Sequence, residues 1–263
     1  MEEHREARSI VETLVQAGFI AYYAGGWVRD FLLQHASDDI DIATNAPPEK
    51  IQELFPRTVP IGLAFGIILV VMGERQYEVA TFRQDLDYQD GRRPSRVAFC
   101  GAEEDAKRRD FTINGMFYDP LTGTILDYVG GQADLQKGIV RAIGNPHERI
   151  REDRLRMIRA IRLSCRFHFP IDPATEAAIR AHATELFPAV AIERVVQELE
   201  KGHAFRKLRP MLLSLYHHDL LVQIFPTLAN TPLVELERRL QPLQHYPQKA
   251  PLIAHLPYPP DNC

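Results

Sequence analysis

Two neighbouring segments decide the fold of this chain: YYAGGWVRD at residues 22–30 and DIDIAT at residues 39–44. Glycine has no Cβ, so a strand that runs into Gly25 and Gly26 lets the backbone approach a ligand closely. Residues 27–33 are expected to form a helix, whose N-terminus would present free N–H groups and a positive dipole to a phosphate. The first segment therefore predicts a phosphate-binding turn.

The second segment alternates acidic and apolar residues. On a strand, Asp39 and Asp41 would share one face, while Ile40 and Ile42 would face the core. Two adjacent carboxylates repel each other unless a cation lies between them, and hard oxygen ligands suit Mg²⁺. A lone Gly-Gly is usually a turn, and a lone Asp-x-Asp is usually a solvated strand edge. Together, the two segments predict a phosphate-binding turn beside a Mg²⁺ site, which is the working part of a nucleotidyltransferase.

The composition is that of a globular protein with ordinary polarity. The chain has 263 residues, of which 45% are hydrophobic and 25% charged, and no apolar run approaches the length needed to span a bilayer. Three widely spaced cysteines argue against a disulfide framework, and the acidic start argues against a secretory signal, so a cytoplasmic, non-membrane protein is expected. The net charge is −4, but residues 149–166 form a local positive stripe.

The pattern of the chain changes near residue 140. Before it, strands and helices are expected to alternate in an α/β head, residues 1–140, and after it the periodicity is wholly helical. Within the head, we expect a helix over 5–18, a strand over 20–24, a hairpin of 67–71 and 76–82, a long mobile loop over 83–100, a short helix over 103–116 and a strand over 125–129. Further helices are expected over 146–167, 173–186, 190–201 and 204–224. We divide the helical part into residues 141–205, a partial body of residues 206–235, and a proline-rich tail of residues 236–263 that is expected to pack little.

A second candidate motif is RRDFTIN at residues 108–114. If this segment is helical, Asp110 and Asn114 lie four residues apart on one face, where both are available to a sugar hydroxyl. The alternative is a surface helix that carries ordinary solvated charges. The sequence alone leaves both interpretations open.

A third candidate motif begins at Glu152. Polar residues recur at every third position in Asp153, Arg156, Arg159 and Arg162, beside an apolar line toward a core. An Asp–Arg pair at this spacing offers acceptors and donors that suit the edge of a nucleotide base. The further arginines suit a triphosphate. A helix with solvated charges is the alternative here too.

These motifs, taken in order over residues 18–205, resemble the bacterial tRNA nucleotidyltransferase and poly(A) polymerase family, the class II CCA-adding type. The resemblance implies a polymerase-beta-like α/β head with a mixed or antiparallel sheet and helices, followed by an all-α neck and a short body. It assigns metal and phosphate binding to the first motif, ribose selection to residues 108–114, and a flexible hinge to residues 127–131. It assigns base reading to Asp153 and Arg156, and support of the reading helix to residues 193–199.

The resemblance also implies a mechanism. Asp39 and Asp41 would bind Mg²⁺ and act in catalysis, with Glu78 as a third carboxylate if its strand pairs with theirs. The nucleotide-binding residues would be Gly25, Gly26, Arg29, Asp30, Arg109, Asp110, Asn114, Asp153, Arg156, Arg159 and Arg162. The substrates would be ATP, CTP and the 3′ end of tRNA or another RNA, with no template.

Several alternatives remain open at this point. The same chemistry would serve an enzyme that adds only A, only CC, or a poly(A) tail. Gly115 stands where the family usually has alanine, which is a minor change. The part after the neck is shorter than in family members, and this feature keeps a non-catalytic RNA-binding protein as an alternative. A nucleotidyltransferase that acts on small molecules would explain the first motif but not the second and third.

Overall fold

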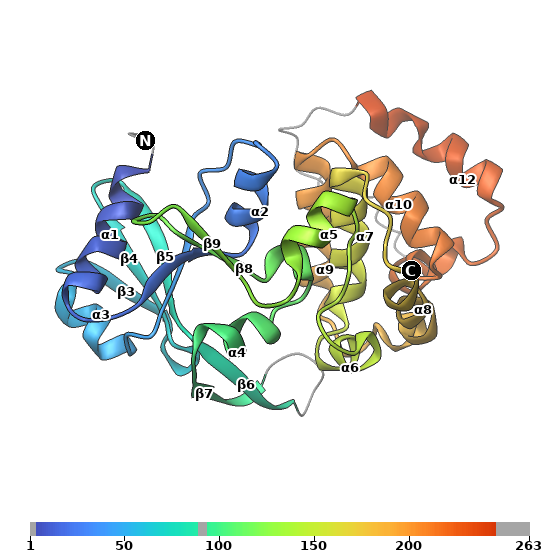
Figure 1. The fold of residues 1–263 in the computed structure, drawn as a ribbon. Helices are drawn as coiled ribbons and strands as arrows, with labels where there is room; N and C mark the ends of the chain where they lie inside the picture. Colours follow the sequence, from blue (N-terminus) through green and yellow to red (C-terminus); the bar gives the residue numbers. More distant parts are fainter. Residues whose placement is uncertain (1–3, 89–93, 246–263) are drawn as a thin grey trace, which may run out of the picture. The chain divides into compact units, whose positions relative to one another are not determined.

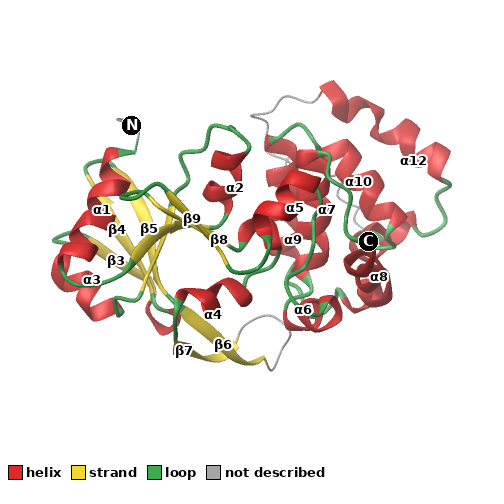
Figure 2. Cartoon of the chain, viewed as in Figure 1, coloured by secondary structure: helices red, strands yellow, loops and turns green. Residues whose placement is uncertain are grey.

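The computed structural model describes residues 4–88 and 94–245, and these residues form two compact units. The first unit comprises residues 4–88, 94–137 and 141–145, and the second comprises residues 138–140 and 146–245. The α/β pattern of the first unit and the helical pattern of the second match the predicted fold class (Figure 2). The finer division into neck, body and tail stays a prediction.

The first unit is built on a seven-stranded sheet in the order β3-β4-β5-β2-β1-β8-β9 (Figure 1). Its strands are β1 Ala21–Ala24, β2 Asp41–Thr44, β3 Thr58–Gly62, β4 Ile67–Met72, β5 Arg75–Thr81, β8 Met116–Asp119 and β9 Thr124–Asp127. The pairs are antiparallel except for β2 and β5, which run parallel. The sheet is therefore mixed, as predicted, and the hairpin predicted over residues 67–82 is β4–β5.

Helices flank the sheet. They are α1 Arg5–Gln16, α2 Gly26–Leu32, α3 Pro48–Leu54, α4 Ala102–Lys107 and α5 Gly131–Lys137, with short 3-10 turns η1 Leu63–Phe65 and η2 Thr112–Asn114. The apolar face of α1 is fully buried, and α1 and α3 pack against strands of the sheet and against each other. Strand side chains alternate, so Ala24, Asp41 and Ala43 share the face opposite to Tyr23 and Ile42.

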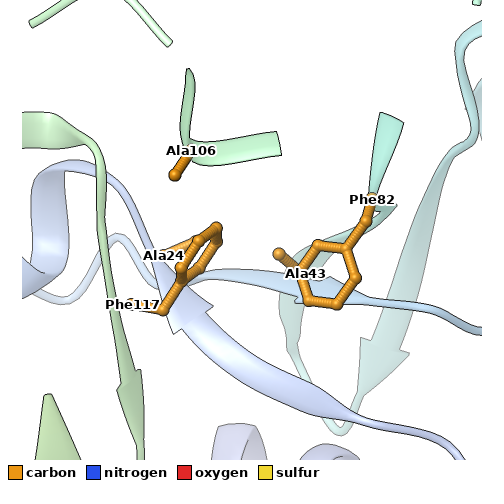
Figure 3. Close-up of a cluster of buried hydrophobic side chains, with 5 residues drawn as sticks. All are labelled: Ala24, Ala43, Phe82, Ala106 and Phe117. Carbon is orange, nitrogen blue, oxygen red and sulfur yellow. The ribbon is translucent and has the colours of Figure 1, made fainter. Parts of the chain in front are cut away.

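A compact apolar cluster lies on the face that carries Ala24 and Ala43. It is completed by Phe82, Ala106 and Phe117, and all five side chains are nearly or completely buried (Figure 3). Phe82 directly follows β5, Ala106 lies in α4 and Phe117 in β8. The cluster thus attaches α4 to the sheet at the strands that carry the first motif.

Two predictions in this unit are wrong. The segment expected as a loop over residues 83–100 contains a two-stranded sheet of β6 Arg83–Tyr88 and β7 Pro94–Phe99, although residues 89–93 lie outside the described part. The helix expected over 103–116 ends at Lys107. Backbone hydrogen bonds from Thr112 N to Arg141 O and from Ile143 N to Asp110 O replace the helical ladder, because this segment pairs with a distant part of the chain.

The named elements of the second unit, in its described part, are all helices. Its helices are α6 Pro146–Glu152, α7 Leu155–Phe167, α8 Pro173–His182, α9 Ile192–Ala204, α10 Leu208–His217, α11 Leu221–Ile224 and α12 Leu233–Leu240, with η3 Ala183–Glu185, η4 Pro226–Leu228 and η5 Gln241–His245. Helices α7, α9 and α10 pack together, and α6 packs against α8 (Figure 1). The helix expected over 146–167 is broken at residues 153 and 154.

The proline-rich tail was expected to begin at residue 236. Residues 236–245 are helical, in α12 and η5, and residues 246–263 lie outside the described part. Among the described helices, none is both long and apolar enough to cross a bilayer.

Candidate active site

The turn between β1 and α2 brings three predicted residues together. Gly25 has a φ of +69° and precedes the first residue of α2. A Cβ at this position would lie 3.2 Å from Arg109 Nη1 and 3.7 Å from Asp41 Oδ2. The positive φ favours glycine at this position, and a Cβ would also crowd the end of the Arg109 side chain. Gly25, Arg109 and Asp41 therefore surround one point at the end of β1.

The predicted carboxylates lie on and next to adjacent strands. In the parallel pair of β2 and β5, Ile42 is opposite Val79, so Asp41 and Glu78 are the preceding neighbours on the same face. Ile40 and Ile42 are buried, as predicted, but β2 begins at Asp41, so Asp39 lies just before the strand. The strand pairing that was expected to bring Glu78 beside Asp41 is present; the catalytic role of Glu78 stays a prediction.

The electrostatics of Asp41 show that these carboxylates interact. Asp41 can be reached by solvent, yet the protein around its carboxyl is dense enough that burial is the largest cause of a raised pKa. Glu78 and Asp39 raise the pKa further and Arg109 lowers it, with a result of about 6. Within residues 4–88 and 94–245, no three His, Cys, Asp or Glu side chains form a ready-made metal site. The exposed oxygen donors and their mutual repulsion nevertheless fit a hard cation.

Arg29 takes part in a buried network. Its Nε and Nη2 atoms donate to Asp30 Oδ1 at 3.0 and 2.9 Å, and its Nη1 donates to Asn114 Oδ1 at 2.5 Å. Asn114 Nδ2 in turn donates to Asp110 Oδ1 at 3.0 Å. Asp110 and Asn114 are thus brought together, although not by the helix that the sequence predicted. The structure places Arg29 only 4% exposed, where it orients Asn114.

Arg109 is held by a residue that the sequence analysis did not select. Its Nε and Nη2 atoms donate to Asp105 Oδ2 at 3.1 and 2.9 Å, and its guanidinium lies 4.9 Å from the centre of the Phe117 ring. Asp105 precedes Arg109 by four residues, which is the spacing of a helical ion pair. The four-residue spacing could have predicted the ion pair between Asp105 and Arg109. It does not reveal that Asp105 is buried.

In the second unit, Asp153 is fixed by an arginine from another helix. It lies between α6 and α7, and its Oδ1 accepts a hydrogen bond from Leu155 N at 3.1 Å. Both Asp153 oxygens accept from Arg194 of α9, at 3.1 and 2.8 Å. Arg194 belongs to the segment that was expected to support the reading helix, but no pairing with Asp153 was predicted.

The arginines of α7 have different partners along the helix. Arg162 is 7% exposed and its Nε donates to Glu198 Oε2 of α9 at 2.5 Å, whereas Arg159 Nη1 lies 3.7 Å from Glu198 Oε1. Burial opposes the ionisation of Glu198, but Arg162 and Arg159 hold its pKa below the usual value. Arg156 donates instead to Glu152 Oε2 and to the Arg149 carbonyl. The drift of a three-residue repeat on a helix turns Arg162 toward α9.

Two family descriptions match the chain. Residues 21–141 match the poly(A) polymerase head domain, and residues 168–231 match the probable RNA and SrmB-binding site of polymerase A. The first covers the unit that contains the carboxylates. The second covers most of the described helical part that follows α7.

Known CCA-adding enzymes are similar over most of the chain. The enzyme of Enterococcus faecalis is 46% identical over 200 residues, which cover 76% of this chain and 49% of that protein. The Bacillus subtilis enzyme is 43% identical over 213 residues, 80% of this chain and 53% of that protein. The chain thus spans about half the length of the curated relatives that it matches.

Solved structures agree. The Bacillus stearothermophilus CCA-adding enzyme in complex with CTP has a TM-score of 0.78 at 35% identity, over 94% of this chain and 59% of that one. The Thermotoga maritima CCA-adding enzyme complexed with tRNA has a TM-score of 0.71 at 26% identity, over 86% and 52%. The chain belongs to the bacterial class II nucleotidyltransferase and poly(A) polymerase family that includes the CCA-adding enzymes.

Proposed function

We propose that the chain transfers CMP and AMP from CTP and ATP to the 3′ end of tRNA without a template, in CCA addition or a part of it. The observation that carries this proposal is the arrangement around Gly25. There, Asp41 on β2 has Glu78 as its neighbour on β5 and Arg109 close to the same glycine. Phosphoryl transfer needs anionic metal ligands, a cationic group and close backbone approach, and the two carboxylates, Arg109 and the glycine turn support these three assignments.

The metal ions are part of this proposal. Polymerase-beta-like nucleotidyltransferases typically use divalent metals, and we assign Mg²⁺ to Asp39 and Asp41, with Glu78 as an additional carboxylate. When bound, Mg²⁺ would stabilise charge on the attacking 3′-hydroxyl and on the leaving pyrophosphate. The repulsion that raises the pKa of Asp41 supports the assignment, because a cation relieves it.

The residues of the chain have separate tasks in the head. The Gly25–Gly26 turn lets the backbone approach the triphosphate, and Arg109 donates to the phosphate or to the ribose. Asp110 and Asn114 are assigned to the ribose hydroxyl, and their mutual hydrogen bond orients both. The donors of Arg29 are directed to Asp30 and Asn114. We therefore assign Arg29 to holding Asn114, and through it Asp110, in place.

In the helical unit, base selection is assigned to Asp153 and Arg156. Arg194 grips both oxygens of Asp153, so the carboxylate has a fixed orientation from which it can accept a hydrogen bond from a base. Arg156 is oriented by Glu152 and by the Arg149 carbonyl. A fixed acceptor and donor discriminate between bases because the wrong base leaves a polar group unpaired.

The proposed substrates follow from the relatives. The Bacillus stearothermophilus structure contains CTP, the Thermotoga maritima structure contains tRNA, and a further solved structure of a CCA-adding enzyme contains ATP. Poly(A) synthesis on other RNAs is the alternative within the same chemistry, and the match to the poly(A) polymerase head domain fits both activities.

The test is nucleotide transfer by the purified chain with CTP or ATP and Mg²⁺. The acceptors are a tRNA that lacks CCA and, separately, aminoglycosides and other small hydroxyl compounds. Transfer to RNA only, abolished by EDTA and by Asp41→Asn, is expected. Transfer only to a small acceptor, or transfer that survives Asp41→Asn, would overturn the proposal.

A further inference from the structure

Asp105 is a buried carboxylate that none of the expected motifs includes. It lies in α4, is 1% exposed, and its two oxygens serve different partners. An ionised carboxylate in such a place is costly unless it is paired and hydrogen-bonded. Burial opposes its ionisation, but Arg109 and Arg108 outweigh this effect and keep the pKa of Asp105 below its usual value.

One oxygen of Asp105 is directed wholly to Arg109. Oδ2 accepts from both Nε and Nη2 of Arg109, at 3.1 and 2.9 Å. The Cζ atom of the same guanidinium lies over the Phe117 ring, 4.9 Å from its centre. Two hydrogen bonds and a ring contact fix the plane of the guanidinium, and Nη1 is then the atom that lies beside Gly25.

The other oxygen of Asp105 serves the start of the β6–β7 hairpin. Oδ1 accepts from Arg83 N at 3.1 Å and from Arg108 Nε at 2.8 Å. The side chain of Arg83 continues to Asp85 Oδ1 at 3.1 Å. A single carboxylate therefore joins the first residue of β6 to the arginine that lies beside Asp41.

We propose that Asp105 is a positioning residue for nucleotide binding, which holds the Arg109 guanidinium beside the Gly25 turn and joins it to the base of the β6–β7 hairpin. The inference rests on the proposed function, because it gives Arg109 a nucleotide as its ligand. A carboxylate that only neutralised the surrounding arginines would not need to direct one oxygen to both donors of Arg109. The positioning role predicts that the effect of Asp105 on nucleotide affinity passes through Arg109.

The test is a double-mutant cycle on CTP binding in the presence of Mg²⁺. Asp105→Asn keeps the shape of the side chain and an oxygen that can accept from Arg83 N. The amide nitrogen then faces Arg109, and the negative charge that orients the Arg109 guanidinium is lost. Asp105→Asn and Arg109→Ala are each expected to raise the Kd and KM for CTP by roughly tenfold, and the double variant is expected to be no weaker than Arg109→Ala alone. Glu103→Gln is the matched control on the same helix, since Glu103 forms an exposed pair with Lys107, and it should leave both constants unchanged.

A purely structural role gives a different result. Loss of folded protein lowers the number of binding sites and kcat but leaves Kd and KM unaltered. Unchanged Kd in a folded Asp105→Asn variant, or additive effects in the double variant, would overturn the inference. If Asp105→Asn does not fold, Arg109→Lys replaces it, because a lysine keeps the charge but cannot donate twice to Oδ2 in the same plane. A normal Kd for Arg109→Lys would then also overturn it.

Measuring CTP binding distinguishes failure of the proposed function from failure of the role proposed for Asp105. If the wild-type chain binds CTP but transfers nothing to RNA, the proposed function fails, while the cycle in Kd still tests Asp105. If the wild-type chain transfers nucleotides but the cycle is additive, only the inference about Asp105 fails. If the wild-type chain binds no CTP with Mg²⁺, both are overturned.

Discussion

Asp41 on β2 has Glu78 as its neighbour on β5, because the two strands run parallel with Ile42 opposite Val79. Two exposed carboxylates on one face of a sheet destabilise each other's charged form, and Glu78 is one cause of the raised pKa of Asp41. In a protein without a ligand this arrangement would be unfavourable. It fits a site that is completed by a cation, which connects the strand order of the sheet to the proposed chemistry.

The first prediction concerns the titration of Asp41. In metal-free protein its pKa is about 6, above the ordinary value of 3.8, and Glu78→Gln should lower it because a neighbouring negative charge is removed. Carboxyl NMR titration of the two proteins measures both values. An Asp41 pKa near 4 in the wild-type protein would contradict the interaction described here.

A second prediction follows for stability. A carboxyl whose pKa is higher in the folded than in the unfolded state makes the folded protein less stable at pH values above the folded pKa. For Asp41 this destabilisation disappears as the pH falls from about 6 toward 3.8. Metal-free Asp41→Asn should therefore have a higher Tm than wild type at pH 8, and the difference should shrink toward pH 4. Thermal melting at several pH values checks this, and a lower Tm for Asp41→Asn at pH 8 would contradict it.

The third prediction concerns the proposed metal ligands. Asp39→Ala and Asp41→Ala should each reduce nucleotide transfer by orders of magnitude while the protein stays folded, because charge on the reacting oxygens is no longer stabilised. Asp38→Ala is the matched control, since it removes an exposed carboxylate one residue before Asp39. Substantial activity in either of the first two variants would remove that residue from the metal site.

The fourth prediction concerns nucleotide choice. Arg156→Ala should lower nucleotide selectivity by roughly tenfold, because a fixed donor to the base is lost. Selectivity here is the kcat/KM for CTP or ATP divided by the kcat/KM for the other nucleotides. Arg180→Ala provides the control, since Arg180 forms an exposed pair with Glu176 on α8. Equal selectivity in wild type and Arg156→Ala would mean that another residue reads the base.

The fifth prediction concerns the pairing of α7 and α9. Glu198 is 2% exposed and holds the buried Arg162, so Glu198→Ala should lower the free energy of unfolding by about 3–5 kcal/mol. Lys201→Ala should change it little, because the Lys201 side chain is 54% exposed and its Nζ lies 3.2 Å from Glu198. Denaturant unfolding measures both. Equal effects of the two substitutions would show that Arg162 does not depend on Glu198.

Local patterns predicted the framework of the fold. The apolar alternation around Asp41 gave β2, and the Gly25–Gly26 turn gave the end of β1. The helical unit followed from its periodicity. The segment after residue 83 was mistaken for a loop because its two strands pair only with each other, with Arg83 opposite Phe99 and Asp85 opposite Val97, and form a sheet separate from the seven-stranded one. The residues around Asp110 were mistaken for a helix because their hydrogen bonds go to residues 141–143, which no local pattern reveals.

The partners of the candidate site residues were harder to predict than the residues themselves. The sequence indicated Arg109, Asp153 and Arg162, and the resemblance indicated that residues 193–199 support the reading helix. It did not indicate Asp105 as a partner of Arg109, nor the pairings of Arg194 with Asp153 and of Glu198 with Arg162. Each pairing depends on which face of a helix becomes buried, and that is decided by tertiary packing. Arg162 is an example: we expected it to steady the triphosphate and the reading helix, and its bond to Glu198 joins α7 to α9, while a role toward the triphosphate stays a prediction.

Primer extension by the purified chain with Mg²⁺ tests whether the chain adds nucleotides to tRNA. The acceptors are tRNAs that end before CCA, after C and after CC, together with an unstructured RNA, and CTP and ATP are supplied separately and together. Addition of C and A to the tRNAs that stops once CCA is complete, or addition of one defined part of that sequence, is expected. Unlimited addition of A to the unstructured RNA would instead make the chain a poly(A) polymerase. Absence of any incorporation on all four acceptors would contradict the proposed activity.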